Sequence, residues 1–97
     1  MIVVTLERWL EPHAPRFLEN RKKDLDTLAG ALAASDFAAV RSVGHNLRGI
    51  APGFGMAPLG EVGVELEAAA HEEDADKVRA CMLKIGRYLA TVRIVYR

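Results

Sequence analysis

The stretch DFAAVRSVGHNLRGIAPGF occupies residues 36–54, and its apolar side chains recur at the spacing of an α-helix. At about 100° per residue they form one stripe, which comprises Phe37, Val40, Val43, Leu47, Ile50 and Phe54. His45 points roughly 160° away from the middle of that stripe, so we expect its imidazole to stand in water. The stretch therefore predicts an amphipathic helix that presents a histidine on its polar face.

The surroundings of His45 in this helix combine positive charge with missing side chains. Its neighbours one turn away on either side are Arg41, Ser42, Arg48 and Gly49. Gly44 and Gly49 both lie inside the helix, although each should cost about 1 kcal/mol relative to alanine. We interpret these glycines as space that lets the surface of another protein reach the histidine.

Pro52 lies near the end of the same stretch. Its ring would clash with the carbonyl of Arg48 if the helix continued unperturbed, so we expect a kink or an early end here. Such a change bears on the direction in which Arg48 points. Our candidate surface for a partner comprises Arg41, Ser42, Gly44, Gly49 and Pro52.

Helical spacing also predicts the elements on either side of this stretch. One long helix begins near Pro15 and ends at Ser35, and a second begins near Pro58 and carries Leu59, Val62, Leu66 and Ala69 inward. The last helix extends from about Ala75 to Tyr96, and no stretch has the alternation of a strand.

A short additional helix is expected at the N-terminus, with Thr5 as its cap and Pro12 at its end. The connections between the long helices are short, which favours antiparallel neighbours. We therefore expect an all-α fold, an up-down antiparallel four-helix bundle with an additional short N-terminal helix. Residues 1–97 form a single domain in this prediction.

The charge balance excludes several classes of partner. Lys plus Arg and Asp plus Glu number thirteen each among the 97 residues, so no positive field attracts nucleic acid or an anionic membrane. No apolar run is long enough to span a bilayer, and residues 1–4 are too short for a secretory core. We expect a cytoplasmic monomer that binds neither nucleic acid nor membrane.

Other reactive residues have ordinary structural explanations. Cys81 is the single cysteine and lies on an apolar helical stripe, so we expect a buried, inert thiol. We interpret Trp9 and Phe54 as core or end-cap residues, and the basic group around Arg21 as a solvated face. The sequence contains no Glu-x-x-His pair of the kind that binds metal in helical bundles. It also contains no recognisable combination of a nucleophile and its base, as a hydrolase would require.

The spacing around His45 resembles the signature of histidine phosphotransfer (HPt) domains, which is His-x-Leu-Lys-Gly followed by a second glycine. His45, Leu47, Gly49 and Gly55 match that pattern. Further matches are Leu59, the Leu66-Glu67 pair, Asp36 and residues 12–17, so the resemblance covers nearly the whole chain. Arg48 stands where the family more often has lysine, and it keeps the charge while offering a fork suited to phosphate oxygens.

The resemblance implies a phosphoryl carrier in a multistep two-component relay, and not an enzyme. A neutral nitrogen of His45 would accept the group from a receiver-domain aspartate and pass it to another, while Arg48 stabilises charge on the phosphoryl oxygens. The partners implied are receiver domains of response regulators or hybrid histidine kinases. The chain would need no cofactor of its own, since magnesium would come with the receiver.

Two alternatives to a carrier remain open from the residues. A helical adaptor could bind receiver-like partners through the same face without being phosphorylated, and Pro52 favours this reading. A plain structural bundle or an oligomerisation module would leave the exposed glycines unexplained.

Overall fold

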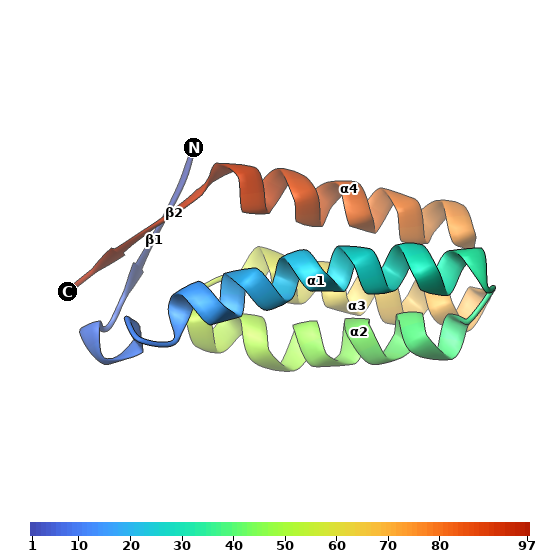
Figure 1. The fold of residues 1–97 in the computed structure, drawn as a ribbon, viewed down its shortest axis with the longest axis horizontal. Helices are drawn as coiled ribbons and strands as arrows, with labels where there is room; N and C mark the ends of the chain where they lie inside the picture. The colour runs from blue at the N-terminus through green and yellow to red at the C-terminus, as the bar shows by residue number, and fades with distance from the viewer.

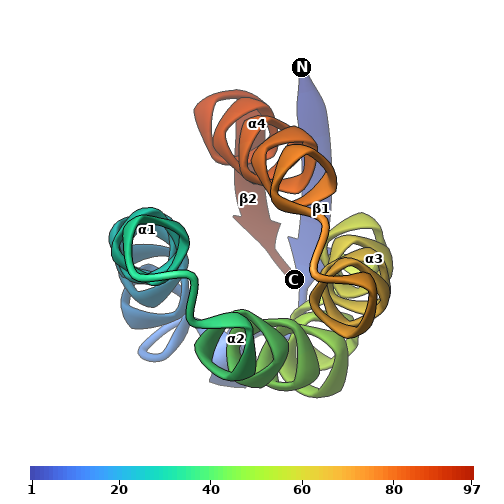
Figure 2. The ribbon, with the colours of Figure 1, turned by 90° about the vertical axis from the view of Figure 1, so that its right-hand side faces the viewer.

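The computed structural model describes all 97 residues, and four helices make up most of it. They are α1 (Ala14–Ala33), α2 (Phe37–Ile50), α3 (Ala57–Glu72) and α4 (Ala75–Thr91). Figures 1 and 2 show them side by side, and the colour gradient shows that each helix runs opposite to the one before it. The prediction of a mainly helical protein with four principal helices is confirmed.

Two short strands meet at one end of the helices, where both chain termini lie (Figure 1). β1 (Ile2–Leu6) pairs in parallel with β2 (Val92–Tyr96), and Ile2 lies opposite Val92. The predicted N-terminal helix is therefore wrong, because only a 3-10 turn, η1 (Arg8–Leu10), follows β1. The predicted end of the last helix is also wrong, since α4 stops at Thr91.

β-Branched side chains explain why these two segments are strands. Both segments are rich in valine and isoleucine, whose stiff side chains suit a pleated backbone better than a helix. Val4 and Leu6 are buried and attach β1 to the core. Trp9, in the turn that follows, is 69% exposed, so of the two roles predicted for it, core or end-cap residue, the core role is wrong.

The helix ends follow from capping residues in the sequence. Pro15 and Pro58 lie in the first turns of α1 and α3, where a missing N–H costs nothing. Asp36 and Asp74 cap α2 and α4, and each carboxylate accepts a backbone N–H at 3.1 Å.

α2 ends at Ile50, two residues before Pro52, as the expected early end requires. A 3-10 turn, η2 (Ala51–Phe54), follows, and Gly55 then adopts φ 66°, which closes the turn. Ile50 is 43% exposed and does not belong to the buried stripe on which it was predicted. Ala51, one turn beyond Leu47, takes that buried position instead.

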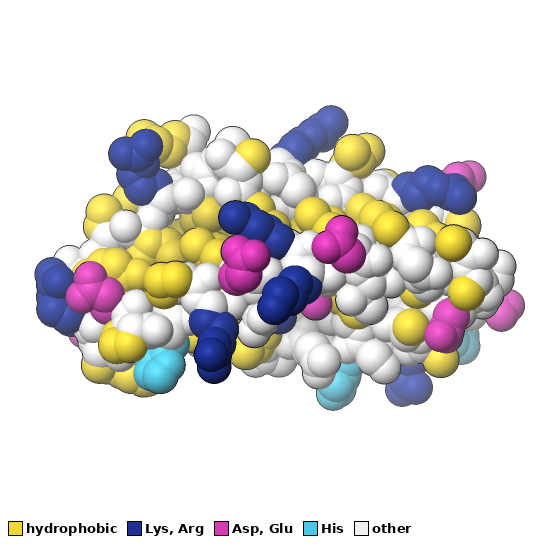
Figure 3. All heavy atoms as spheres, viewed as in Figure 1, with side chains coloured by type: hydrophobic (Ala, Val, Ile, Leu, Met, Phe, Trp, Pro, Cys, Tyr) yellow, Lys and Arg dark blue, Asp and Glu magenta, His cyan; other side chains and the backbone are white.

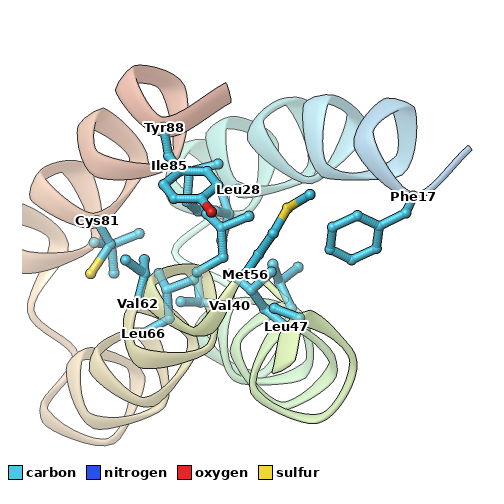
Figure 4. Packing of buried hydrophobic residues seen from close by; sticks show 14 of the residues in the cluster. Phe17, Leu28, Val40, Leu47, Met56, Val62, Leu66, Cys81, Ile85 and Tyr88 are labelled. Atoms are coloured by element: carbon cyan, nitrogen blue, oxygen red, sulfur yellow. The ribbon is translucent and has the colours of Figure 1, made fainter. Parts of the chain in front are cut away.

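The core receives side chains from all four helices (Figure 4). Its largest fully buried members are Leu28, Leu47, Met56, Leu59, Leu66, Ile85, Val40 and Val78. Cys81 is buried among them, and this burial is the main cause that raises the pKa of its thiol to about 11. The predicted burial of this thiol is confirmed, and the raised pKa disfavours the reactive thiolate near neutral pH.

Arg21 departs from the solvated basic face predicted for it. It is 7% exposed, lies over the ring of Phe17 at 4.7 Å, and donates from Nε to Asp24 at 2.7 Å. Burial raises the pKa of Asp24, although Arg21 opposes this shift. Phe17 in turn stacks on Phe54, with ring centroids 4.3 Å apart. The guanidinium therefore packs on the ring of Phe17, and Phe17 in turn connects α1 to η2.

Candidate functional site

His45 lies on α2, and its side chain is 66% exposed. The buried residues of α2 are Val40, Val43, Gly44 and Leu47. His45 is not one of these residues, so it lies on the polar face of α2, as predicted. Solvent and a partner can both reach the ring.

Two glycines allow α2 and α3 to approach unusually closely beside His45. A Cβ on Gly44 would lie 2.7 Å from the carbonyl oxygen of Gly63, and a Cβ on Gly63 would lie 2.6 Å from the amide nitrogen of Arg48. Such distances are far below van der Waals contact, so neither position has room for a side chain. The backbones of the two helices therefore touch at this point.

The close approach brings Glu67 of α3 across to the polar face of α2. Glu67 follows Gly63 by one helical turn, so both residues lie on the side of α3 that faces α2. Its Oε2 is 3.7 Å from Nδ1 of His45, and its Oε1 is 3.3 Å from Nη1 of Arg48. One carboxylate thus lies between the imidazole and the guanidinium.

Arg48 stays inside α2 despite the proline that follows. The helix continues to Ile50, so Arg48 keeps its place one turn from His45, and its side chain is 52% exposed. The ring of Pro52 fits over α3 where Gly60 has no side chain, since a Cβ there would lie 3.3 Å from Cγ of the proline. Pro52 therefore packs η2 against α3, and Arg48 remains within α2.

A shallow groove extends from His45 towards the turn between α3 and α4. Arg41, Ser42 and Asn46 line it from α2, and His71 lines it from α3. The hydroxyl of Ser42 donates to the carbonyl of Ala38 at 3.2 Å, so only its acceptor lone pairs remain for a partner. On the face shown in Figure 3, basic and acidic side chains are interspersed.

Gly44 and Gly49 do not share the role that the sequence predicted for them. Gly44 is buried against α3, so its assignment to the partner-binding surface is wrong: its missing side chain serves helix packing. Gly49 is exposed, and a Cβ there would have nothing within 4 Å. Of the two, only Gly49 offers open space beside the histidine.

Glu67 and Gly63 have functions in this site that were not predicted from the sequence. Glu67 appeared only within the Leu66-Glu67 pair, and its contact with His45 joins residues on two helices. A usable signal was present, because Gly60, Gly63 and Glu67 recur at spacings of three and four on one side of a helix. That spacing marks a helix face that a neighbouring backbone approaches closely.

The structure contains no group of three or more His, Cys, Asp or Glu side chains placed to hold a metal ion. None of the helices combines the length and the apolar character needed to cross a bilayer.

Comparisons with known proteins give one match. The family model described as Hpt domain matches residues 15–93, which include α2, α3, α4 and all of α1 except Ala14, and leave β1 outside. No curated protein and no solved structure matches the chain.

Proposed function

Because the chain belongs to the Hpt domain family, whose members carry phosphoryl groups on histidine in phosphorelays, we propose that His45 is its phosphoacceptor. The observation that carries the proposal is the cluster of His45, Glu67 and Arg48. It combines an exposed imidazole, a carboxylate within 3.7 Å of Nδ1 and a guanidinium one turn away. The cluster lies on α2 and α3, and we assign the four helices together to the up-down antiparallel bundle predicted from the sequence.

The transfer requires a neutral ring nitrogen with a free electron pair. Nδ1 of His45 faces Glu67, so Nε2 is the nitrogen assigned as the nucleophile. Nε2 attacks the phosphorus of a phosphoaspartate, the P–O bond breaks, and the aspartate leaves as a carboxylate. The proton stays on Nδ1, where the carboxylate of Glu67 offsets the positive charge that the ring acquires.

We assign to Arg48 the role of stabilising negative charge on the phosphoryl oxygens. Its guanidinium offers a planar fork of donors suited to them, and its exposed side chain is free to turn towards the ring. Phosphoryl transfer depends mostly on positioning and on stabilising charge, so a small helical protein needs little further machinery.

The partners proposed are receiver domains of response regulators or hybrid histidine kinases. Arg41, Ser42, Gly49 and Pro52 are the exposed residues near His45 assigned to their docking, and Gly49 gives the closest access. The magnesium ion of the reaction is assigned to the receiver, and the chain is assigned no cofactor of its own. A monomeric state and a cytoplasmic location stay predictions.

The adaptor alternative rested on Pro52. Its support is weaker now, because α2 continues past Arg48 and the proline packs on Gly60 of α3. The carrier is therefore the first proposal, and phosphorylation separates the two functions.

The test uses a receiver domain charged with acetyl phosphate and magnesium. The parent chain should gain the mass of one phosphoryl group, and acid should remove it, as for a phosphoramidate. His45→Gln should abolish the gain while the free energy of unfolding changes by less than about 0.5 kcal/mol, because the side chain is exposed.

His71→Gln is the matched control, since His71 is also exposed and lines the same groove. This variant should be phosphorylated like the parent. A parent chain that binds the charged receiver and never gains mass would establish the adaptor instead.

A further inference from the structure

Helices α1 and α4 leave a row of apolar side chains half-buried where they meet. On α1 the row comprises Leu18, Leu25 and Leu32, and on α4 it comprises Met82 and Leu89. Both rows have the seven-residue spacing that favours packing against a further helix. In Figure 3 hydrophobic side chains remain visible along the seam between α1 and α4, so no other element covers them there.

The outer side of α4 extends this row towards solvent. Leu83 follows Met82 and is 61% exposed. Gly86 lies one turn further along, and a Cβ there would have nothing within 4 Å. A glycine inside a helix costs about 1 kcal/mol relative to alanine, and no contact within the chain requires one here. A large exposed apolar side chain beside open space is typical of a surface that packs against a partner. We call this surface, together with the two rows, the α1–α4 face.

The charges beside the α1–α4 face have opposite signs on its two helices. On α1 the acidic residues Glu19 and Asp26 are seven positions apart, and on α4 the basic residues Arg79 and Arg87 are eight apart. These separations correspond to about 10 and 12 Å along a helix. Asp26 and Arg87 form no ion pair within the chain, Arg79 pairs only within its own helix, and Glu19 has only a 3.9 Å pair with Lys22.

This pattern makes the face complementary to itself. α1 and α4 lie side by side and run in opposite directions (Figure 1). A two-fold axis parallel to the helices places α1 of one copy over α4 of a second copy, again in opposite directions. Asp26 then lies opposite Arg79 of the second copy, and Glu19 lies opposite Arg87 of the second copy.

The other two-fold arrangement places α1 over α1 and α4 over α4. It brings Glu19 of one copy to Asp26 of the other, and Arg79 to Arg87. Like charges at such short range are destabilising. The charges therefore favour the arrangement of α1 over α4.

The size of the face sets the strength of such an association. α4 has 17 residues and is about 26 Å long. Two neighbouring helices about 9 Å apart present a face about 18 Å wide, so each copy would contribute about 500 Å². A total of about 1,000 Å² is near the smallest area of a specific interface. The association should therefore be weak and depend on concentration.

From these features we infer that a second copy of this chain binds the α1–α4 face and forms a symmetric dimer. The inference departs from the monomer expected from the sequence, and it does not depend on the proposed function. α2 and α3, which carry His45 and Arg48 on one helix and Glu67 on the other, lie on the opposite side of the molecule (Figure 2). The histidine of each copy would stay accessible in the dimer.

The first test is sedimentation equilibrium of the chain from about 5 to 500 μM. The average mass should rise from one chain towards two, with a dissociation constant of about 10–100 μM for an interface of this size. Leu83→Glu should raise this constant at least about tenfold, because it places a charge in the middle of the apolar contact. Val64→Glu is the matched control, since Val64 is 49% exposed on α3 and lies outside the α1–α4 face. It should keep the parent constant.

Charge reversal tests the pairing of α1 with α4. Asp26→Arg and Arg79→Asp should each raise the dissociation constant about tenfold, since symmetry repeats each repulsion. The two reversals in one chain should restore it to within about threefold of the parent value.

A parent chain that stays monomeric at every concentration overturns the inference and leaves the face to a helix of another protein. A dimer that Leu83→Glu does not weaken also overturns it, because the contact would then lie elsewhere. Two reversals that together weaken the dimer further overturn the arrangement of α1 over α4.

Discussion

Gly44 and Gly49 are five positions apart on one helix, and the structure gives them opposite surroundings. Gly44 lies against the backbone of α3, whereas Gly49 faces open space. Helical geometry separates them by about 500°, which is 140° around the axis, so they cannot share a face. The sequence pattern identified both glycines as meaningful, but only the position of α3 determines which one packs internally.

Alanine substitutions at these two glycines should therefore change stability in opposite directions. Gly44→Ala should lower the free energy of unfolding by about 2 kcal/mol, because its Cβ would meet a backbone carbonyl that cannot move aside. Gly49→Ala should raise it by about 1 kcal/mol, the difference in helix propensity. Chemical denaturation measures both values.

Gly49→Ala also serves as the control for Gly44→Ala, since both add the same methyl group to the same helix. Equal and stabilising effects would show that α2 and α3 do not approach as closely as the structure describes.

At the scale of elements, side-chain periodicity predicted the four helices well because each has one face against the core. The first and last residues of a helix were also predictable where a capping residue was present, as at Asp36. The end of α4 has no such signal, since the residues after Thr91 continue an apolar spacing compatible with a helix. They pair with β1 at the other end of the chain, and a local sequence pattern cannot predict a pairing between such distant segments.

The two connections before α2 and α4 each contain a residue in the left-handed region. Ser35 and Glu73 both have φ 53°, a conformation that favours glycine at helix C-termini. Glu73→Gly should therefore raise the free energy of unfolding by about 1 kcal/mol. Thermal or chemical denaturation measures the change.

Glu72→Gly is the control at the neighbouring position. Glu72 is the last residue of α3, and glycine should destabilise it through lower helix propensity and loss of the pair with Lys77. If Glu73→Gly destabilised the protein as well, the left-handed conformation would not be the strained feature inferred here.

At the scale of the whole molecule, the cluster of His45, Glu67 and Arg48 shows how far one sequence could predict a site. His45 and Arg48 were predictable because they belong to one helix, where spacing fixes their relation. Glu67 was not, because its distance to His45 depends on how closely α3 packs on α2. That distance is a property of the packed helices and has no local pattern.

The parallel pairing of β1 with β2 has a consequence for the order in which the protein folds. Ile2 and Val92 are partners across almost the entire chain, so the sheet requires the largest loop closure in the molecule. The contacts between consecutive helices are more local and should form first. We therefore expect the sheet to form after the transition state for folding.

Val4→Ala tests this order through kinetics. Val4 is buried in β1, and removal of its two methyl groups should cost about 1.5 kcal/mol, enough for a reliable comparison. The variant should unfold about tenfold faster while its folding rate stays near that of the parent. Leu66→Ala, at the contact of α3 with the core, should slow folding instead. A slowed folding rate in Val4→Ala would show that the sheet forms early.

A strand pair that forms late stabilises the native state without stabilising the transition state for folding. The sheet would then govern how long the folded molecule persists, whereas the helices would set the rate at which it assembles.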